Sequence, residues 1–193
     1  LAFVGRVSPQ KRLDRAIAIA TELGLPLKVA AKIDCTEEAY YKESIEPLLV
    51  DNPLVEFLGE IDDAGKQELL SNSLALLFPI DWEEPFGLVM IEANACGTPV
   101  IAWRNGSTPE VIHPGVNGVL VDSIAEAVDA VRQVDRLDRQ AIRHDFEQRF
   151  SVTRQAEQYE QLYLRLLENH DSNGSHQPLQ RPCSPRDPQL HAA

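Results

Sequence analysis

Short, mostly apolar runs alternate with longer amphipathic stretches along most of the chain. Runs of this kind, bounded by turn residues, are typical of strands that are covered on both faces of a parallel sheet. The pattern predicts six strands, with the sequences LAFVG, LKVAAKI, LVEFLG, LALLFPI, TPVIAW and NGVLVD, which begin at Leu1, Leu27, Leu54, Leu74, Thr98 and Asn117.

The stretches between these runs have apolar residues three or four positions apart, as on one face of a helix. In the first, SPQKRLDRAIAIATELG, Ser8 is the expected cap, Pro9 suits the first helical position and Gly24 suits the end. Asp34 or Thr36 is the expected cap of the second. Further helical segments are predicted over residues 36–49, 62–73, 87–96, 107–112 and 123–168.

Regular alternation of strands and helices implies parallel strands joined by right-handed crossovers. The predicted fold class is therefore α/β, with a doubly wound, six-stranded, Rossmann-like sheet. Ligands of such sheets bind beyond the carboxyl ends of the strands, so the loops that follow the strands are where functional residues are expected.

The overall composition and charge argue against nucleic-acid binding and against a metal site. The 193 residues are 44% hydrophobic and carry a net charge of −12, which disfavours broad nucleic-acid binding. Cys35, Cys96 and Cys183 form no Cys-x-x-Cys pair, and the five histidines form no His-x-x-x-His pair, so we expect no metal site. Cysteines without a pairing pattern make a reducing cytoplasm the simplest compartment.

The two ends of the sequence indicate where the folded domain begins and ends. The first residue, Leu1, already lies in a strand pattern, so we expect that an N-terminal part is missing. Residues 169–193 are polar and rich in proline, and a disordered tail is predicted there, after a folded domain over residues 1–168.

The first loop, GRVSPQK, places two cations beside a predicted helix start. Gly5 permits close backbone approach, and Arg6 and Lys11 would add to the anion preference of a helix N-terminus. This pattern favours either a phosphate or diphosphate site or two solvated surface charges. The loop is neither a Walker loop nor Gly-x-Gly-x-x-Gly, so a dinucleotide cofactor is not indicated.

The stretch DWEEPFGLVMIEA contains Glu84 in a predicted loop and Glu92 on the helix that follows. Eight helical residues span roughly 12 Å, more than the separation of hydrolytic carboxylate pairs. Ionised carboxylates suit a ligand rich in hydroxyl groups, such as a sugar or a ribose. The alternative is that Glu84 complements the helix dipole while Glu92 lies on the surface. Glu83 is predicted to be a surface charge.

A third loop, RNGSTPEVI, follows the fifth strand near the same edge. Gly106 and Ser107 begin a short helix there, and Glu110 would cap or hold the loop. Trp82 and Trp103 lie at strand ends and would either line a pocket or a domain interface, or pack in the core or at its rim. His113 and His144 have no partner at an informative spacing.

Taken together, GRVSPQK, EPFGLVMIEANACGTPVIA and GSTPEVI resemble the C-terminal, donor-binding domain of retaining GT-B glycosyltransferases of group 1, or family 4. The resemblance covers residues 1–167. It implies a metal-independent transferase, without a cofactor, that moves a sugar with retention of configuration from a nucleotide-diphosphate sugar. It also implies an N-terminal domain that binds a glycan, lipid or small-molecule acceptor, and a location in the cytoplasm or peripherally at the inner membrane face.

The resemblance assigns roles residue by residue. Arg6 and Lys11 would clamp the diphosphate and stabilise the leaving group. Glu84 would hold the transferred sugar and Glu92 the ribose. Of these, Arg6, Lys11 and Glu84 are the expected catalytic residues, and no nucleophile is identified.

The remaining expected donor contacts are less directly assigned. Gly5 lies beside the diphosphate clamp, and backbone groups of the helix start would contact sugar and phosphate. By position, the loops after the second and third strands would approach the base. These contacts would come from Phe86, Gly87, Leu88, Lys32 and Ile61.

Two departures and two alternatives accompany this interpretation. Many relatives have Lys-Gly in the first loop, where Arg12 follows Lys11 here, and a glycine-rich segment where this chain has VAAKID. The chain alone could be a nucleotide-sugar-binding module that is inactive without its N-terminal domain. It could also belong to another GT-B enzyme, such as a sugar epimerase or phosphorylase.

Overall fold

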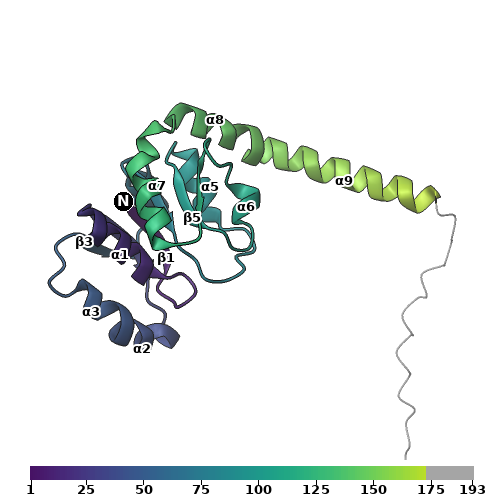
Figure 1. The fold of residues 1–193 in the computed structure, drawn as a ribbon. Helices are drawn as coiled ribbons and strands as arrows, with labels where there is room; N and C mark the ends of the chain where they lie inside the picture. Colours follow the sequence, from purple (N-terminus) through teal and green to yellow (C-terminus); the bar gives the residue numbers. More distant parts are fainter. Residues whose placement is uncertain (173–193) are drawn as a thin grey trace, which may run out of the picture. The chain divides into compact units, whose positions relative to one another are not determined.

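A computed structural model describes the backbone of residues 1–172 and the side chains of residues 1–169. The six predicted strands are all present and all parallel, in the order β3-β2-β1-β4-β5-β6 (Figure 1). This confirms the predicted α/β class and Rossmann-like sheet. The strands are β1 Ala2–Arg6, β2 Leu27–Lys32, β3 Val55–Gly59, β4 Leu76–Phe78, β5 Val100–Trp103 and β6 Gly118–Val121.

Helices connect the strands and follow the last one. The predicted helical stretch from residue 123 is divided into α7, a 3₁₀ turn (η3, Val134–Arg136), α8 and α9. The helices are α1 Leu13–Leu23, α2 Glu38–Tyr40, α3 Glu46–Leu49, α4 Asp63–Ser71, α5 Leu88–Ala95, α6 Thr108–Val111, α7 Ile124–Gln133, α8 Arg139–Phe150 and α9 Val152–Ser172.

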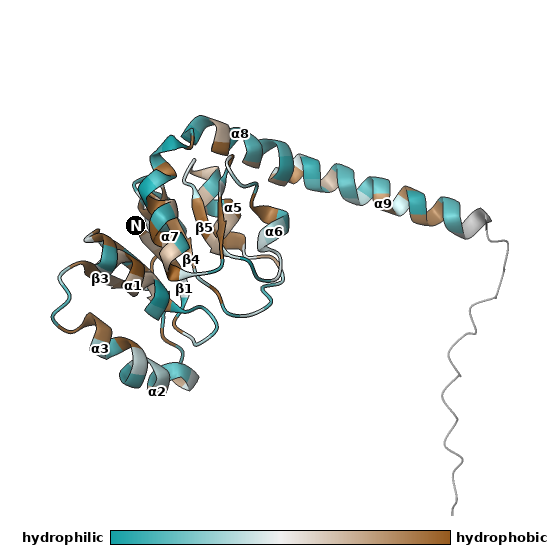
Figure 2. Cartoon of the chain, viewed as in Figure 1, coloured by the Kyte–Doolittle hydropathy of each residue, from teal (hydrophilic) through white to brown (hydrophobic). Residues whose placement is uncertain are grey.

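The helices cover the sheet in two layers. α1 packs beside α7 (Figure 1). On the other face, α4 packs beside α5, which in turn contacts α8. The strands β4 and β5 are buried on both faces, and apolar residues are concentrated in the sheet and on the inward helix surfaces (Figure 2). The chain winds from β1 outward to β3 and then returns to add β4 on the other side of β1. The β1–β4 boundary is therefore the switch point of the sheet.

The first helix begins later than the sequence indicates. Ser8 and Pro9 lie in a turn, in which the Ser8 carbonyl accepts from the N–H of Lys11 (3.1 Å) and of Arg12 (3.4 Å). Arg12 then adopts a left-handed conformation, φ 52°, and α1 starts at Leu13. The prediction that Ser8 caps the helix is therefore wrong, because the left-handed residue interrupts the helix path between Pro9 and Leu13.

The second crossover is irregular rather than one helix over residues 36–49. It contains a 3₁₀ turn (η1, Cys35–Glu37), α2, a π-helical segment (η2, Tyr41–Ile45) and α3. Pro47 cannot donate a backbone hydrogen bond and its ring crowds the preceding turn, which accounts for the wider π turn just before it. Asp34 precedes η1, but its side chain makes no cap bond, so neither predicted cap acts as one.

Asp145 of α8 links α8 to the segment between α6 and β6. Its carboxylate accepts from Arg149 (3.0 Å) and Asn117 (2.8 Å) and lies 3.1 Å from the His113 ring. His113 therefore has a partner that its sequence spacing did not reveal. Arg149 also donates to the carbonyls of Glu110 (2.6 Å) and Val111 (3.0 Å), which holds the end of α6.

The chain divides into two compact units, residues 1–154 and 155–193. In the second unit, α9 continues to Ser172, beyond the predicted end of the folded domain at residue 168. The predicted disordered tail otherwise lies outside the described residues, as does Cys183. Cys35 and Cys96 are free thiols. None of the described helices combines the length and the apolarity that a membrane crossing requires.

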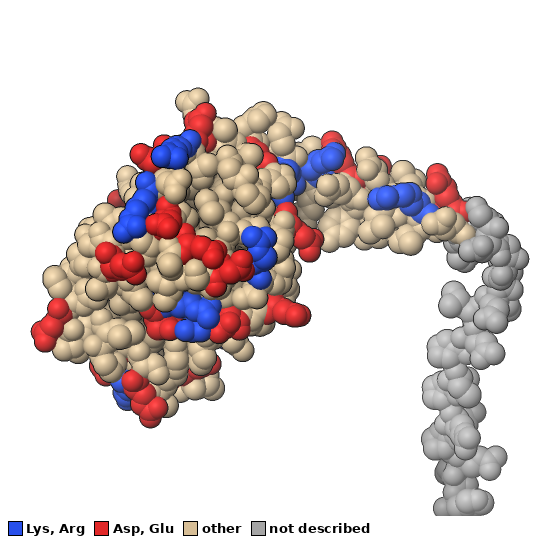
Figure 3. All heavy atoms as spheres, viewed as in Figure 1, with Lys and Arg blue, Asp and Glu red and all other residues tan. Residues whose placement is uncertain are grey.

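Acidic and basic side chains are interspersed on the face of the molecule shown in Figure 3. No single basic patch dominates this view. Over the whole sequence, acidic residues outnumber basic ones, 30 to 18, which gives the net charge of −12.

Replacement of Asp145 by alanine is expected to destabilise the first unit. Asp145 is 13% exposed, and its loss leaves Arg149 and Asn117 without their shared acceptor, at a cost of about 2–3 kcal/mol. The exposed Asp129, which pairs with Arg132, is a matched control, and Asp129→Ala should cost less than about 0.5 kcal/mol. Urea unfolding of both variants measures the difference, and equal stabilities would contradict the role of Asp145.

Candidate functional site

The switch point brings two loops together at the carboxyl end of the sheet. The loop after β1, residues 7–12, meets the loop after β4, residues 79–87, because β1 and β4 are neighbouring strands. The backbone N–H of Asp81 donates to the carbonyl of Gln10 (2.8 Å), which ties the loops directly. The first and second candidate stretches of the sequence therefore lie side by side.

Lys11 and Glu84 form an ion pair between these two loops. The Lys11 Nζ donates to Glu84 Oε2, and the side chains are 17% and 11% exposed. The indole N–H of Trp82 donates to the same oxygen at 3.0 Å. The Lys11 ammonium also lies 5.2 Å from the centroid of the Trp82 ring and 5.6 Å from that of Phe78. Trp82 thus belongs to the site, and Glu84 has a fixed carboxylate.

Arg12 and Arg15 hold the two loops in place. The guanidinium of Arg12 bonds Asp14 (2.8 Å) and Asp81 (2.7 Å), and Arg15 reaches Asp81 (3.2 Å) and the Pro79 carbonyl (3.2 Å). Asp14 and Asp81 raise the pKa of Arg12, first through the hydrogen bond to Asp14. These anchors offset the left-handed backbone of Arg12, φ 52°, which residues other than glycine rarely adopt.

The guanidinium of Arg15 lies 5.2 Å from the Trp103 ring centroid. Trp103 is only 6% exposed. Trp103, the last residue of β5, therefore packs at the core, whereas Trp82 lines the site.

The helix α5 begins at the edge of the same site. Gly87 precedes it with φ 76°, and a Cβ at this position would lie 2.7 Å from Met90 Cε. Within the described residues, no acceptor is bonded to the backbone N–H of Phe86, Gly87 or Leu88. These groups remain available to an anion or a sugar oxygen, as the sequence indicated. Phe86 is partly exposed and its ring packs edge-on to Phe150, whereas the Leu88 side chain is exposed.

The third loop supports the backbone on either side of Glu84. The Ser107 N–H donates to the Glu84 carbonyl (2.9 Å), and its hydroxyl donates to the Phe86 carbonyl (2.8 Å). Gly106, φ 55°, lies so close that a Cβ there would be 2.5 Å from the Glu84 carbonyl oxygen. The predicted holding role therefore falls to Gly106 and Ser107. Glu110 contributes its carbonyl, which accepts from Arg149.

Arg6 and Lys32 lie on paired strands at the same edge. They are register partners at the ends of β1 and β2, and both approach Asp34, at 3.6 Å and 3.5 Å. The Arg6 side chain is 55% exposed. The structure thus places Arg6 beside Lys32 in a cationic pair around one carboxylate, while Lys11 lies beside Glu84. The sequence indicates Asp34 only as a helix cap, because its contacts with Arg6 and Lys32 depend on the pairing of β1 with β2.

Glu92 lies on α5 and pairs with Lys66 of α4, at 2.8 Å between Nζ and Oε1. Glu84 and Glu92 therefore contact different lysines from different elements. This arrangement does not resemble a carboxylate pair that shares one proton. The sequence analysis did not select Lys66, because its link to Glu92 depends on how α4 packs against α5.

The remaining candidates are Gly5 and Ile61. Gly5 lies within β1, and a Cβ there would meet only Phe3 Cε1, at 4.0 Å. Ile61 follows β3, packs against the hydrophobic core and lines a surface hollow with residues of α4. Glu83 is exposed, as expected.

The charges at the site are balanced before any ligand binds. Glu84 pairs with Lys11, and Glu92 pairs with Lys66. A ligand with a diphosphate therefore does not meet two unpaired carboxylates. Glu84 and Glu92 provide hydroxyl acceptors, and Arg6, Lys11, Lys32 and the α5 N-terminus favour phosphate oxygens. Over the part of the chain that the structure describes, no three His, Cys, Asp or Glu side chains converge as metal ligands.

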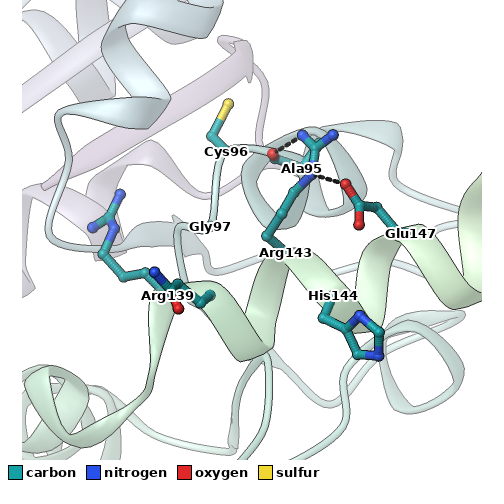
Figure 4. A pocket seen from close by; sticks show the side chains of 8 residues that line it. Ala95, Cys96, Gly97, Arg139, Arg143, His144 and Glu147 are labelled. Atoms are coloured by element: carbon teal, nitrogen blue, oxygen red, sulfur yellow. Dashed lines mark hydrogen bonds and ion pairs between the residues drawn. The ribbon is translucent and has the colours of Figure 1, made fainter.

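A separate hollow of about 560 Å³ lies at the opposite, amino-terminal end of β5 (Figure 4). Its two arginines are already engaged in the fold. Arg139 donates to Thr98 Oγ1 (2.7 Å), and Arg143 donates to the Ala95 carbonyl and to Glu147 (2.7 Å). The switch-point site therefore remains the stronger candidate.

The fold is that of one lobe of the GT-B type, since the solved structures that this chain resembles are GT-B glycosyltransferases. HepE from Anabaena, solved in complex with UDP, matches with a TM-score of 0.70 and 26% identity over 83% of this chain and 48% of that protein. A complex of the same protein with UDP and glucose also matches, with a TM-score of 0.67. AviGT4, a glycosyltransferase involved in avilamycin A biosynthesis, matches with a TM-score of 0.71 and 27% identity, over 86% and 51%.

The family model described as glycosyl transferases group 1 matches residues 1–170, and the chain belongs to this family. D-inositol 3-phosphate glycosyltransferase of Mycolicibacterium smegmatis is 30% identical over 72% of this chain. N-acetyl-alpha-D-glucosaminyl L-malate synthase of Bacillus anthracis is 33% identical over 61% of it. The chain spans about a third of the length of these relatives, 33% and 32% respectively.

Replacement of Gly106 by alanine is expected to disrupt the support of Glu84. The added Cβ meets the Glu84 backbone and also forces a left-handed alanine, at a combined cost of about 3 kcal/mol or more. Gly115→Ala is the control, because its φ of 79° imposes the backbone cost of about 1 kcal/mol without any steric contact. Thermal unfolding compares the two, and equal melting temperatures would show that Gly106 does not approach Glu84 closely.

Proposed function

We propose that this chain is the donor-binding lobe of a retaining, metal-independent glycosyltransferase that uses a nucleotide-diphosphate sugar. The observation that carries the proposal is the switch-point cluster of Lys11, Trp82 and Glu84 beside the free N-terminus of α5. A similar solved protein holds UDP, and UDP with glucose, which supports a nucleotide-sugar as the donor class.

The assigned roles follow the chemistry of the site. Departure of the nucleoside diphosphate builds negative charge on the phosphate oxygens, and preorganised cations lower that barrier. Arg6 and Lys11 take this role, Glu84 accepts hydroxyls of the transferred sugar, and Glu92 accepts those of the ribose. Lys32 and Ile61 lie toward the base. This electrostatic stabilisation requires no metal ion and no cofactor.

The Lys11–Glu84 ion pair is formed before a ligand binds. Lys11 bonds one oxygen of Glu84, so an arriving phosphate shares the ammonium with Glu84 rather than meeting a free cation. The ammonium has three donors, which allows it to bond both groups at once. We therefore propose that Lys11 bridges the sugar-binding carboxylate and the diphosphate when the donor is bound.

Transfer itself requires an acceptor lobe, which we place on a second domain of the same protein. The acceptor is a glycan, a lipid or a small molecule. We propose that the enzyme acts in the cytoplasm, or peripherally at the inner face of the membrane. A chain that binds the donor but supports no transfer with such a lobe present would be a binding module instead.

Donor binding is testable with the 193-residue chain. Calorimetric titration with UDP, GDP, ADP and CDP should give a dissociation constant in the micromolar range for at least one nucleotide, or about −8 kcal/mol. Glu84→Gln should weaken binding of the corresponding nucleotide-sugar relative to that of the nucleoside diphosphate, because Glu84 contacts the sugar and Lys11 the diphosphate. If no nucleotide binds, the proposed function is refuted.

The charge on Lys11 is the second testable element. Lys11→Met keeps the length of the side chain, and should weaken nucleoside diphosphate binding by roughly tenfold and slow transfer in the two-lobe enzyme by about 10²–10³-fold. Lys28→Met removes the same charge from an exposed pair with Glu56, at the opposite end of β2, and should change neither quantity. Equal behaviour of both variants would contradict a role for Lys11 in holding the diphosphate.

A further inference from the structure

Lys66 is the side chain that meets Glu92, and neither the sequence motifs nor the resemblance assigned it a role. It comes from α4, whereas Glu92 lies on α5, 26 residues further along the chain. The Lys66 Nζ is 2.8 Å from Glu92 Oε1 and 3.2 Å from Asp63 Oδ1. The contact therefore depends on the packing of α4 against α5.

The first turn of α4 fixes the base of the Lys66 side chain. Asp62 caps this helix by accepting from the Gly65 N–H (2.8 Å), and the Lys66 N–H donates to the Asp62 carbonyl (2.8 Å). The Lys66 side chain is 25% exposed, so it is more restricted than a surface lysine. Its Cα cannot shift without loss of the capped turn.

The pairing engages one oxygen of Glu92 and leaves the other open. Among the residues that the structure describes, Lys66 is the only side chain bonded to Glu92, and it bonds Oε1. The hydrogen bond to Glu92 raises the pKa of Lys66, so the lysine stays charged over the physiological range. A hydrogen bond to one oxygen restricts the orientation of a carboxylate, and with it the directions of the remaining acceptor sites.

The surroundings of Glu92 and Asp63 distinguish the Lys66–Glu92 pair from an ordinary surface ion pair. Glu92 is 35% exposed and lies on the helix whose N-terminus faces the proposed diphosphate. Asp63 is fully exposed and can satisfy Lys66 only weakly, so Glu92 is its principal partner. The lysine also offsets the charge of Glu92, which would otherwise repel the diphosphate.

We propose that Lys66 is a positioning residue that orients the Glu92 carboxylate to accept hydrogen bonds from the 2′- and 3′-hydroxyls of the donor ribose. This inference rests on the proposed function, because it requires a nucleotide at the site. Lys66 itself need not touch the ligand. Its contribution is the selection of ribose over a sugar that lacks one of the two hydroxyls.

The test compares ribonucleotides with their 2′-deoxy counterparts. Dissociation constants are measured by calorimetry for UDP, GDP, ADP and CDP and for the four corresponding 2′-deoxynucleoside diphosphates, with the 193-residue chain. The wild type should bind the preferred ribonucleotide at least about tenfold more tightly than its deoxy form, as expected for loss of one charge-assisted hydrogen bond. In Lys66→Met this ratio should fall to about twofold or less, and Glu92→Gln should lower it as well.

A matched variant separates positioning from general charge effects. Lys42→Met removes a lysine that pairs with Glu38 in an exposed i,i+4 contact, and should keep the wild-type ratio. Lys66→Arg retains a charged donor and should recover part of the discrimination. Melting temperatures of all variants report whether the fold is intact, and the ratio remains informative for a moderately destabilised variant because both ligands meet the same protein.

The outcomes distinguish failure of the proposed function from failure of the role proposed for Lys66. If the wild type binds no nucleotide, the proposed function fails. If it binds ribonucleotides and 2′-deoxyribonucleotides equally, the assignment of the ribose to Glu92 fails. If the wild type discriminates and Glu92→Gln does not, while Lys66→Met keeps the full wild-type ratio, the proposal for Lys66 alone is overturned.

Discussion

The adjacency of β1 and β4 is the constraint on which the site depends. Because the chain returns to the middle of the sheet after β3, the loops that follow β1 and β4 meet at one edge. Their contact allows Lys11 to reach Glu84 and Arg12 to reach Asp81. Neither contact is local in sequence, so a different strand order would leave the same residues as separate surface charges. The topology thus produces the site as well as the core.

Pairing of carboxylates with cations is the recurring device around this edge. Glu84 pairs with Lys11, Glu92 with Lys66, and Asp34 lies between Arg6 and Lys32. An acidic chain with net charge −12 can therefore present hydroxyl acceptors beside cations without a field that repels phosphate. The same pairs fix side-chain orientation before a ligand arrives, and preorganisation of this kind lowers the cost of binding.

The structural support of the site extends well behind the residues that would contact a ligand. Gly106 and Ser107 hold the backbone around Glu84, and Ser107 immediately precedes α6, whose far end is bonded by Arg149 of α8. Sequence inspection located this loop but favoured Glu110 as its holding group. That choice was wrong because a carboxylate is conspicuous in a sequence, whereas a hydroxyl and a missing Cβ act only through close approach in three dimensions.

The sequence by itself determined the six parallel strands, their approximate limits and the residue types at the carboxyl edge, because hydrophobic periodicity and turn residues are local properties. It also identified the family through motifs that are contiguous in the chain, and the match over residues 1–170 confirms this. The tertiary structure decided the start of α1 at Leu13 and the partners of each charge. A left-handed Arg12 is stabilised by Asp81, and Glu92 is paired by Lys66, through contacts between segments that only folding brings together.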